Sequence, residues 1–196
     1  MLIDYEFPAP LQKNREPVSK PARIGWLAFY GIFPLYAFRN RSVHLLIDYV
    51  FVPIHEDGHL LFSYFGHTLM VAGGTILQLG VPVMLAIHFA FQRQPTGTAL
   101  CSFFFFENVL NVATTMAESR RMDLQYVTVG DPDFAEHDWL TMFSQMCVLE
   151  YDTKIAAVVR VIGWLGMIAV AVWLWWTTKQ SAHPESPHAL RPFSRV

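Results

Sequence analysis

Four long apolar blocks constrain this chain more than any other feature of its sequence. They cover residues 43–66, 69–91, 98–117 and 155–176. Each has about the 20 residues that an α-helix needs to cross the hydrocarbon core of a bilayer. In lipid, the backbone satisfies its hydrogen bonds only as a helix or a closed barrel. The blocks therefore predict an all-α, polytopic membrane bundle of about four spanning helices.

Composition agrees with a membrane protein. Charged residues make up 15% of the chain and hydrophobic residues 53%, whereas soluble domains carry roughly 25% charged residues. The net charge is −2, which gives no indication of a nucleic-acid partner. Membrane lipids are the expected surroundings of the protein.

The rest of the sequence predicts three parts. They are an irregular N-terminal arm over 1–23, a single helical membrane domain with a metal site over 24–178, and a flexible C-terminal tail over 179–196. Residues 24–38 are apolar but shorter than a span, which predicts an interfacial or re-entrant segment. The polar stretch 119–154 contains the run LTMFSQMCVLEY, which predicts an amphipathic helix.

Lysine and arginine are distributed unequally between the loops that four spans would leave. Ten of them lie before the first span, between the second and third, or after the fourth. Only three lie between the third and fourth spans: Arg120, Arg121 and Lys154. Because cytoplasmic loops carry the excess of positive residues, both termini are predicted to be cytoplasmic, in a plasma or inner membrane.

The first block contains a motif of titratable residues, HEDGH, over residues 55–59. Ionisable groups at membrane depth are costly and usually functional. His55 and His59 are four residues apart, so a helix places both imidazoles on one face, where they can bind one cation. Glu56 could then act as general base by taking a proton from a water on the metal. The motif predicts one Zn²⁺ per chain.

A hydrolytic zinc site needs a third protein ligand. The motif lies nearer the outer side of the membrane, where the polar stretch must also lie. The sequence EHDW in that stretch makes His137 the expected third ligand, against the alternative that these residues only cap the helix that follows. The other candidates are Asp138, Glu118 and Asp123. Glu107, in the third block, is the next candidate if none of these binds.

Polar and small residues in the second and third blocks have predicted roles around this site. Gly73 and Gly74 permit a close approach of neighbouring backbones. Gln78 lies one turn further on and offers two donors and an acceptor. Asn108 and Asn111 share a helix face at about the depth of the histidines. They could hold substrate, orient metal ligands or form hydrogen bonds between helices.

The motif HEDGH in one apolar block, followed by GGTILQ in the next, resembles the site-2-type intramembrane zinc metalloproteases over roughly residues 43–92. The resemblance implies His55 and His59 as zinc ligands and Glu56 as general base. It matches Gly73-Gly74 and Gln78, more loosely, to the family's Gly-Pro and Asn. The family's third ligand is an Asp followed by Gly in a later span, and no later block here contains that pair. HDW is the expected replacement.

These observations predict a membrane-embedded zinc metallohydrolase. Its leading substrate is a peptide bond in a transmembrane or juxtamembrane helix, which makes the protein a metalloprotease. Three alternatives remain open. The same metal and base could hydrolyse a lipid ester or amide, the site could be a haem or di-metal redox centre, or the chain could be a non-catalytic subunit of a membrane complex.

Overall fold

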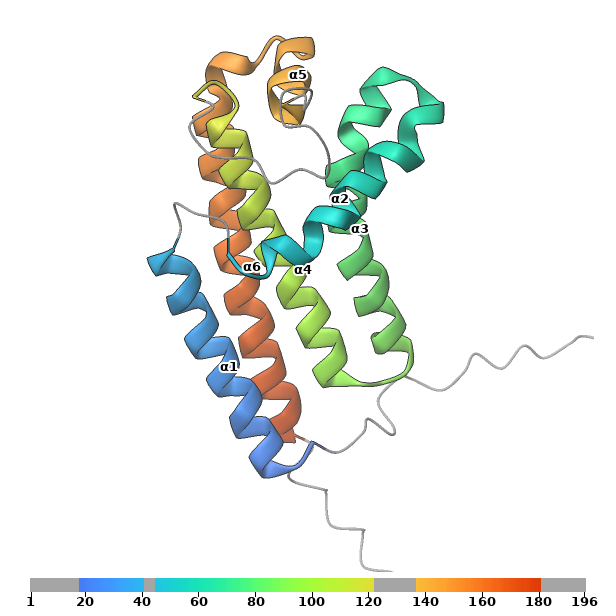
Figure 1. Ribbon diagram of the computed structural model, residues 1–196. Helices are drawn as coiled ribbons and strands as arrows, with labels where there is room; N and C mark the ends of the chain where they lie inside the picture. The colour runs from blue at the N-terminus through green and yellow to red at the C-terminus, as the bar shows by residue number, and fades with distance from the viewer. Residues whose placement is uncertain (1–17, 41–44, 122–136, 181–196) are drawn as a thin grey trace, which may run out of the picture.

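The computed structural model describes residues 18–40, 45–121 and 137–180, and this part of the chain consists of helices and turns alone (Figure 1). The elements are α1 (Lys20–Arg39), α2 (Asp48–Phe62), η1 (Ser63–Phe65), α3 (His67–Phe91), α4 (Pro95–Glu118), α5 (Asp138–Gln145), η3 (Leu149–Tyr151) and α6 (Asp152–Gln180). The prediction of an all-α bundle is confirmed. The predictions for 1–17, Asp123 and 181–196 lie outside the described residues.

Three helices in the described part are long and apolar enough to cross a membrane: His67–Phe91, Pro95–Glu118 and Leu149–Lys179. They correspond to the apolar blocks 69–91, 98–117 and 155–176. The chain is therefore a membrane protein. Only three residues separate α3 from α4, with Arg93 at a φ of 60°, so the two helices run antiparallel.

The remaining block, 43–66, is not one continuous helix. Its helix α2 has 15 residues, fewer than the roughly 20 that a span needs. In the turn before α2, the backbone N–H of Leu45 donates a hydrogen bond of 2.5 Å to the carboxylate of Asp48, the first residue of the helix. Gly66 has a φ of 95°, which other residues rarely adopt, and there the chain reverses into α3. The hydropathy of the sequence does not indicate either interruption of the block.

Residues 24–38, predicted as interfacial or re-entrant, form most of the 20-residue helix α1. The Ser19 hydroxyl caps its start by accepting from the backbone N–H of Ala22 at 3.4 Å. Aromatic side chains then pack onto α4, with the ring centroids of Tyr30 and Phe103 4.8 Å apart. This packing sets α1 lengthwise against the bundle. It runs beside α6 and ends partway along it (Figure 1).

Helix α4 is the centre of the bundle, packed against α3 on one side and α6 on the other. Two glycines of α6 permit the close approach on the second side. A Cβ on Gly166 would overlap the Phe106 ring, and a Cβ on Gly163 would lie 2.5 Å from the Leu110 side chain. Helix α2 packs mainly against α3, outside this core. The HEDGH motif therefore lies at the edge of the bundle.

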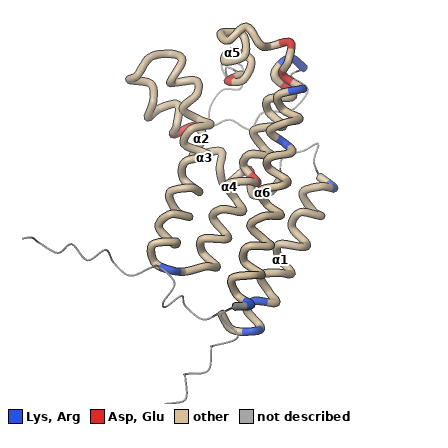
Figure 2. The backbone as a smooth tube through the Cα atoms, turned by 180° about the vertical axis from the view of Figure 1, so that it is seen from behind, with Lys and Arg blue, Asp and Glu red and all other residues tan. Residues whose placement is uncertain are grey.

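Positive residues gather at the end of the bundle where α1 begins, α6 ends and α3 turns into α4 (Figure 2). Lys20 is the first residue of α1, Lys179 lies in the last turn of α6, and Arg93 lies in the α3–α4 turn. Charges of both signs occur at the opposite end. There Arg120 forms an ion pair with the buried carboxylate of Asp152 at 2.5 Å, which ties α4 to the start of α6.

Candidate metal centre

The candidate site depends on a close crossing of α2 and α3. A Cβ on Gly58 would overlap the carbonyl oxygen of Gly73, so the two backbones touch. A Cβ on Gly74 would lie 2.6 Å from Nε2 of His55 and 2.7 Å from Nε2 of His59. Only glycine at this position leaves room for both imidazoles. The close approach expected from Gly73 and Gly74 thus occurs, and it occurs against the motif.

Three potential ligand atoms meet at this crossing: Nε2 of His55, Nε2 of His59 and a carboxylate oxygen of Asp138. Asp138 Oδ2 lies 2.9 Å from Nε2 of His55 and 3.3 Å from Nε2 of His59, and the two nitrogens are 3.2 Å apart. Ligands about 2.0–2.1 Å from a tetrahedral zinc lie about 3.3 Å from one another. The three atoms therefore have nearly the spacing of one face of a zinc tetrahedron.

Hydrogen bonds orient both imidazoles. Nδ1 of His55 lies 3.0 Å from the side-chain oxygen of Gln78, and Nδ1 of His59 lies 2.9 Å from the carbonyl oxygen of Met70. Each partner is an acceptor, so each Nδ1 carries the proton and donates it. Nε2 of each ring is left with its lone pair directed at the shared point. This arrangement is typical of histidines that bind metal.

The orientation of Gln78 is itself fixed from α4. The Asn108 amide donates to the carbonyl oxygen of Phe104 at 2.8 Å, which leaves its oxygen to accept. The Gln78 amide donates to that oxygen at 2.8 Å and to the Asn111 oxygen at 3.3 Å. The Gln78 oxygen must then face His55. The two asparagines thus form interhelical hydrogen bonds and, through Gln78, position a candidate ligand.

If no cation is present, the close approach of the His55, His59 and Asp138 side chains requires a proton between them. Two imidazole lone pairs and a carboxylate are all acceptors, and they lie within about hydrogen-bonding distance of one another. The hydrogen bond to Asp138 raises the pKa of His59 to about 9. Burial alone would raise the pKa of Asp138, but its contacts with the His55 and His59 imidazoles outweigh this effect and lower that pKa. A metal cation would satisfy the same three acceptors.

The third potential ligand in this group is Asp138, which was an alternative to His137 in the prediction from the sequence. Asp138 is the first residue of α5, and His137 is the N-cap before it, with its carbonyl accepting from the backbone N–H of Thr141 at 2.9 Å. Neighbouring helical residues project about 100° apart, so only one of the two faces α2. Glu118, at the end of α4, and the buried Glu107 are not in the group.

Glu56 follows His55 on α2 and is partly exposed. Within the described residues, no hydrogen bond or ion pair engages its carboxylate. Its carboxylate is thus unpaired within the described residues, one position along α2 from a potential ligand. The structure brings together His55, His59, Asp138 and the supporting residues Gln78, Asn108 and Asn111.

Fold and site together define a helical membrane protein that carries a His-His-Asp group at the edge of its bundle. Comparisons of the chain with family models, with curated proteins and with solved structures each gave no match.

Proposed function

We propose that this protein is a membrane-embedded zinc hydrolase whose metal ligands are His55, His59 and Asp138. The observation that carries the proposal is the spacing of the three ligand atoms, 2.9 to 3.3 Å, around a point to which both Nε2 lone pairs are directed. Two nitrogens and one carboxylate oxygen are a ligand set used by hydrolytic zinc enzymes. Asp138 takes the place that the sequence assigned first to His137.

Bound in this set, zinc supplies a Lewis acid that polarises a carbonyl and lowers the pKa of water. The chain's own residues have the other roles in the proposed mechanism. Gln78 and Met70 hold the imidazoles in the ligating tautomer. Glu56, adjacent to His55 and unpaired among described residues, accepts the proton of the attacking water. Helix α5 carries the third ligand, so the site is complete only when α5 is docked on α3 and α4.

The substrate we propose is a peptide bond in a membrane-embedded or juxtamembrane helix. Because α2 packs mainly against α3, its other faces are open, with Tyr49, Val50 and Leu60 all at least half exposed. In a bilayer these side chains would face lipid. A substrate within the membrane could then approach the site sideways without crossing the core. This matches the chemistry implied by the resemblance to site-2-type proteases, of which the chain would be a divergent member.

We further propose that both termini are cytoplasmic and that α5 faces outward. Lys20, Arg93 and Lys179 lie at the end where α1 begins and α6 ends, which supports this orientation because cytoplasmic ends carry positive residues (Figure 2). It can be tested by labelling in intact cells after Cys101 and Cys147 are changed to Ser. An impermeant reagent should modify Ser144→Cys and spare Gln92→Cys, both of which are exposed positions. The reverse pattern would overturn the orientation.

Metal analysis and turnover test the function itself. We expect about one zinc per purified chain and none in the His55→Ala/His59→Ala double variant. Glu56→Gln should keep its zinc while cleavage of a membrane-anchored peptide reporter falls by roughly 10²–10⁴-fold, the usual contribution of a general base. Full zinc content in the double variant would refute the metal site. Unchanged turnover in Glu56→Gln would refute the role of the base.

A further inference from the structure

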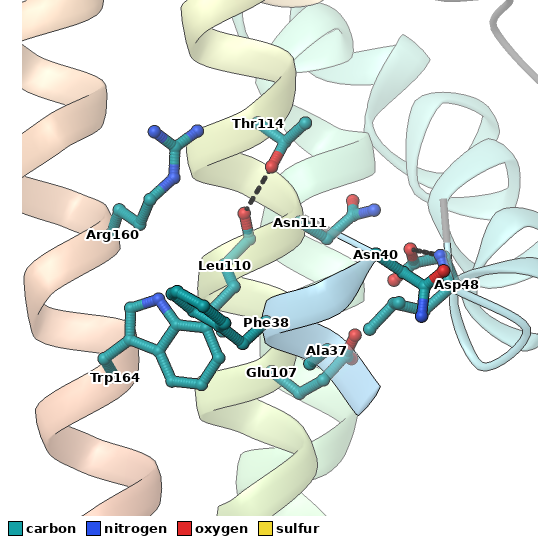
Figure 3. A pocket seen from close by; sticks show the side chains of 11 residues that line it. Ala37, Phe38, Asn40, Asp48, Glu107, Leu110, Asn111, Thr114, Arg160 and Trp164 are labelled. Carbon is teal, nitrogen blue, oxygen red and sulfur yellow. Dashed lines mark hydrogen bonds between the residues drawn. The ribbon is translucent and has the colours of Figure 1, made fainter. Parts of the chain in front are cut away.

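A cavity of about 90 Å³ lies where α1 ends and α2 begins, against α4 and α6 (Figure 3). It is separate from the ligand cluster. Asp48 from α2 and Glu107 from α4 line it, together with Arg160 and Trp164 from α6.

Two buried carboxyl groups meet at this cavity. Asp48 is 6% exposed and Glu107 is 1% exposed, and the two carboxyl groups lie within hydrogen-bonding reach of each other. Oε2 of Glu107 is fully buried, and no described group donates a hydrogen bond to it. Such an acceptor is costly unless a ligand or a proton satisfies it. Its side chain is among those that line the cavity (Figure 3).

Charge balance defines what kind of ligand could satisfy the buried Glu107 acceptor. With both carboxyl groups ionised, Asp48 and Glu107 bring two negative charges to one cavity. One positive charge between them relieves their repulsion. A proton shared between Asp48 and Glu107 provides it in the absence of ligand. A ligand that displaces this proton must bring a positive charge of its own, and an anion would add to the repulsion.

The chemistry of the walls favours an ammonium group on a carbon chain over an inorganic ion. An ammonium offers three N–H donors to the oxygens of Asp48, Glu107 and Asn111. Leu110 and Trp164 provide apolar surface for the methylene groups behind it. An alkali or alkaline-earth ion would instead need about six oxygen ligands, and apolar side chains cannot supply them.

The cavity is connected to the metal centre. Asn111 lines the cavity and accepts the hydrogen bond from Gln78, whose oxygen holds His55. Asp48 precedes His55 by two helical turns, a rise of about 10 Å. An extended peptide covers about 3.3 Å per residue. The two sites are therefore about three residues of extended substrate apart.

We propose that this cavity is a substrate subsite that binds a primary alkylammonium group, the side chain of a lysine about three residues from the scissile bond. This assignment rests on the proposed hydrolase function for its peptide context. The binding of the ammonium group itself depends on Asp48 and Glu107 and does not require zinc. The two parts can therefore fail separately.

Binding of n-butylammonium to the purified full chain tests the subsite directly. Calorimetry should show saturable binding, with none for 1-butanol or butyrate at equal concentration. Glu107→Gln and Asp48→Asn should each weaken it by roughly ten- to a hundredfold, as expected for loss of a charged hydrogen-bond partner. Asp57→Asn, an exposed acid on the same helix as Asp48, is the matched control and should bind as the wild type does.

The zinc-free His55→Ala/His59→Ala variant separates the two proposals, because it should still bind n-butylammonium. Absence of binding to the wild type overturns the subsite and leaves the metal site untouched. Sodium that displaces the amine at equal concentration shows an inorganic cation site and also overturns it. If Glu107→Gln does not fold, Asp48→Asn decides: wild-type affinity in that variant refutes the assignment.

Kinetics test the peptide context. In a cleavable peptide, replacing the lysine three residues from the scissile bond with norleucine should raise KM by about tenfold or more in the wild type. The same replacement should have no effect in Glu107→Gln, with its zinc content unchanged. Equal KM values for the lysine and norleucine peptides in the wild type would overturn the lysine subsite. So would a preference for an amine-bearing lipid over both peptides.

Discussion

Removing the Gln78 side-chain amide should weaken zinc binding although Gln78 is not a ligand. Gln78 is 5% exposed, accepts from Nδ1 of His55 at 3.0 Å and donates to Asn108 at 2.8 Å. In Gln78→Leu the Nδ1–H of His55 loses its acceptor, and Nε2 loses its fixed direction. Loss of such a partner costs about 10–100-fold in metal affinity. This corresponds to about 1.4–2.7 kcal/mol, the range for one buried unsatisfied group.

Competition with a chromophoric chelator measures this loss. Gln92→Leu is the matched control, because Gln92 also contacts a histidine, His88 at 2.8 Å, but at the exposed end of α3. We expect the control to keep wild-type affinity. Gln78→Glu should not be conservative, because its carboxylate would face the Asn108 oxygen without a proton to donate. Wild-type zinc affinity in Gln78→Leu would refute the inference that α4 positions His55 through Gln78.

Three further perturbations address the ligand set. Asp138→Ala should abolish zinc binding while His137→Ala keeps it, as measured by metal content after dialysis; the opposite result would restore His137 as the ligand. Gly74→Ala should lose zinc, because its Cβ would lie 2.6 and 2.7 Å from the two Nε2 atoms, whereas Gly80→Ala, with nothing within 4 Å, should bind normally. In zinc-free protein, the hydrogen bond to Asp138 raises the pKa of His59 from 6.5 to about 9. The pair therefore stabilises the fold fully below about pH 6.5, and this stabilisation is lost as the pH rises through about 9. The loss in the free energy of unfolding is at most about 3 kcal/mol. Thermal melts should show that loss in the wild type and not in Asp138→Asn.

The sequence predicts well those features that depend on local spacing. Three spanning helices follow from hydropathy, and the shared face of His55 and His59 follows from the helical repeat. The interruption of the block 43–66 was not predictable in this way. It depends on a hydrogen bond from the Leu45 backbone N–H to the Asp48 side chain and on a positive φ at Gly66, while the residues around both remain apolar.

From the sequence, the third potential ligand could be assigned to a short segment but not to a single residue. His137 and Asp138 are neighbours, and zinc binds either residue type. The choice depends on where α5 begins and on the direction in which its first residue projects toward α2. Both are set by the tertiary docking of α5 on α3 and α4. Periodicity in the segment itself carries no information about that docking.

The direction of every donor between α4 and the ligand cluster follows from one backbone carbonyl. Phe104 accepts from the Asn108 amide, so the Asn108 oxygen must accept from Gln78, and the Gln78 oxygen must accept from His55. Reversing any amide would place two acceptors or two donors face to face in a buried site, at a cost of about 1–3 kcal/mol each. Nε2 of His55 is therefore left as an acceptor opposite Asp138, and only a cation or a proton can satisfy both. The chain of amides thus holds the His55 proton on Nδ1, away from the carboxylate, which is the tautomer that ligation through Nε2 requires.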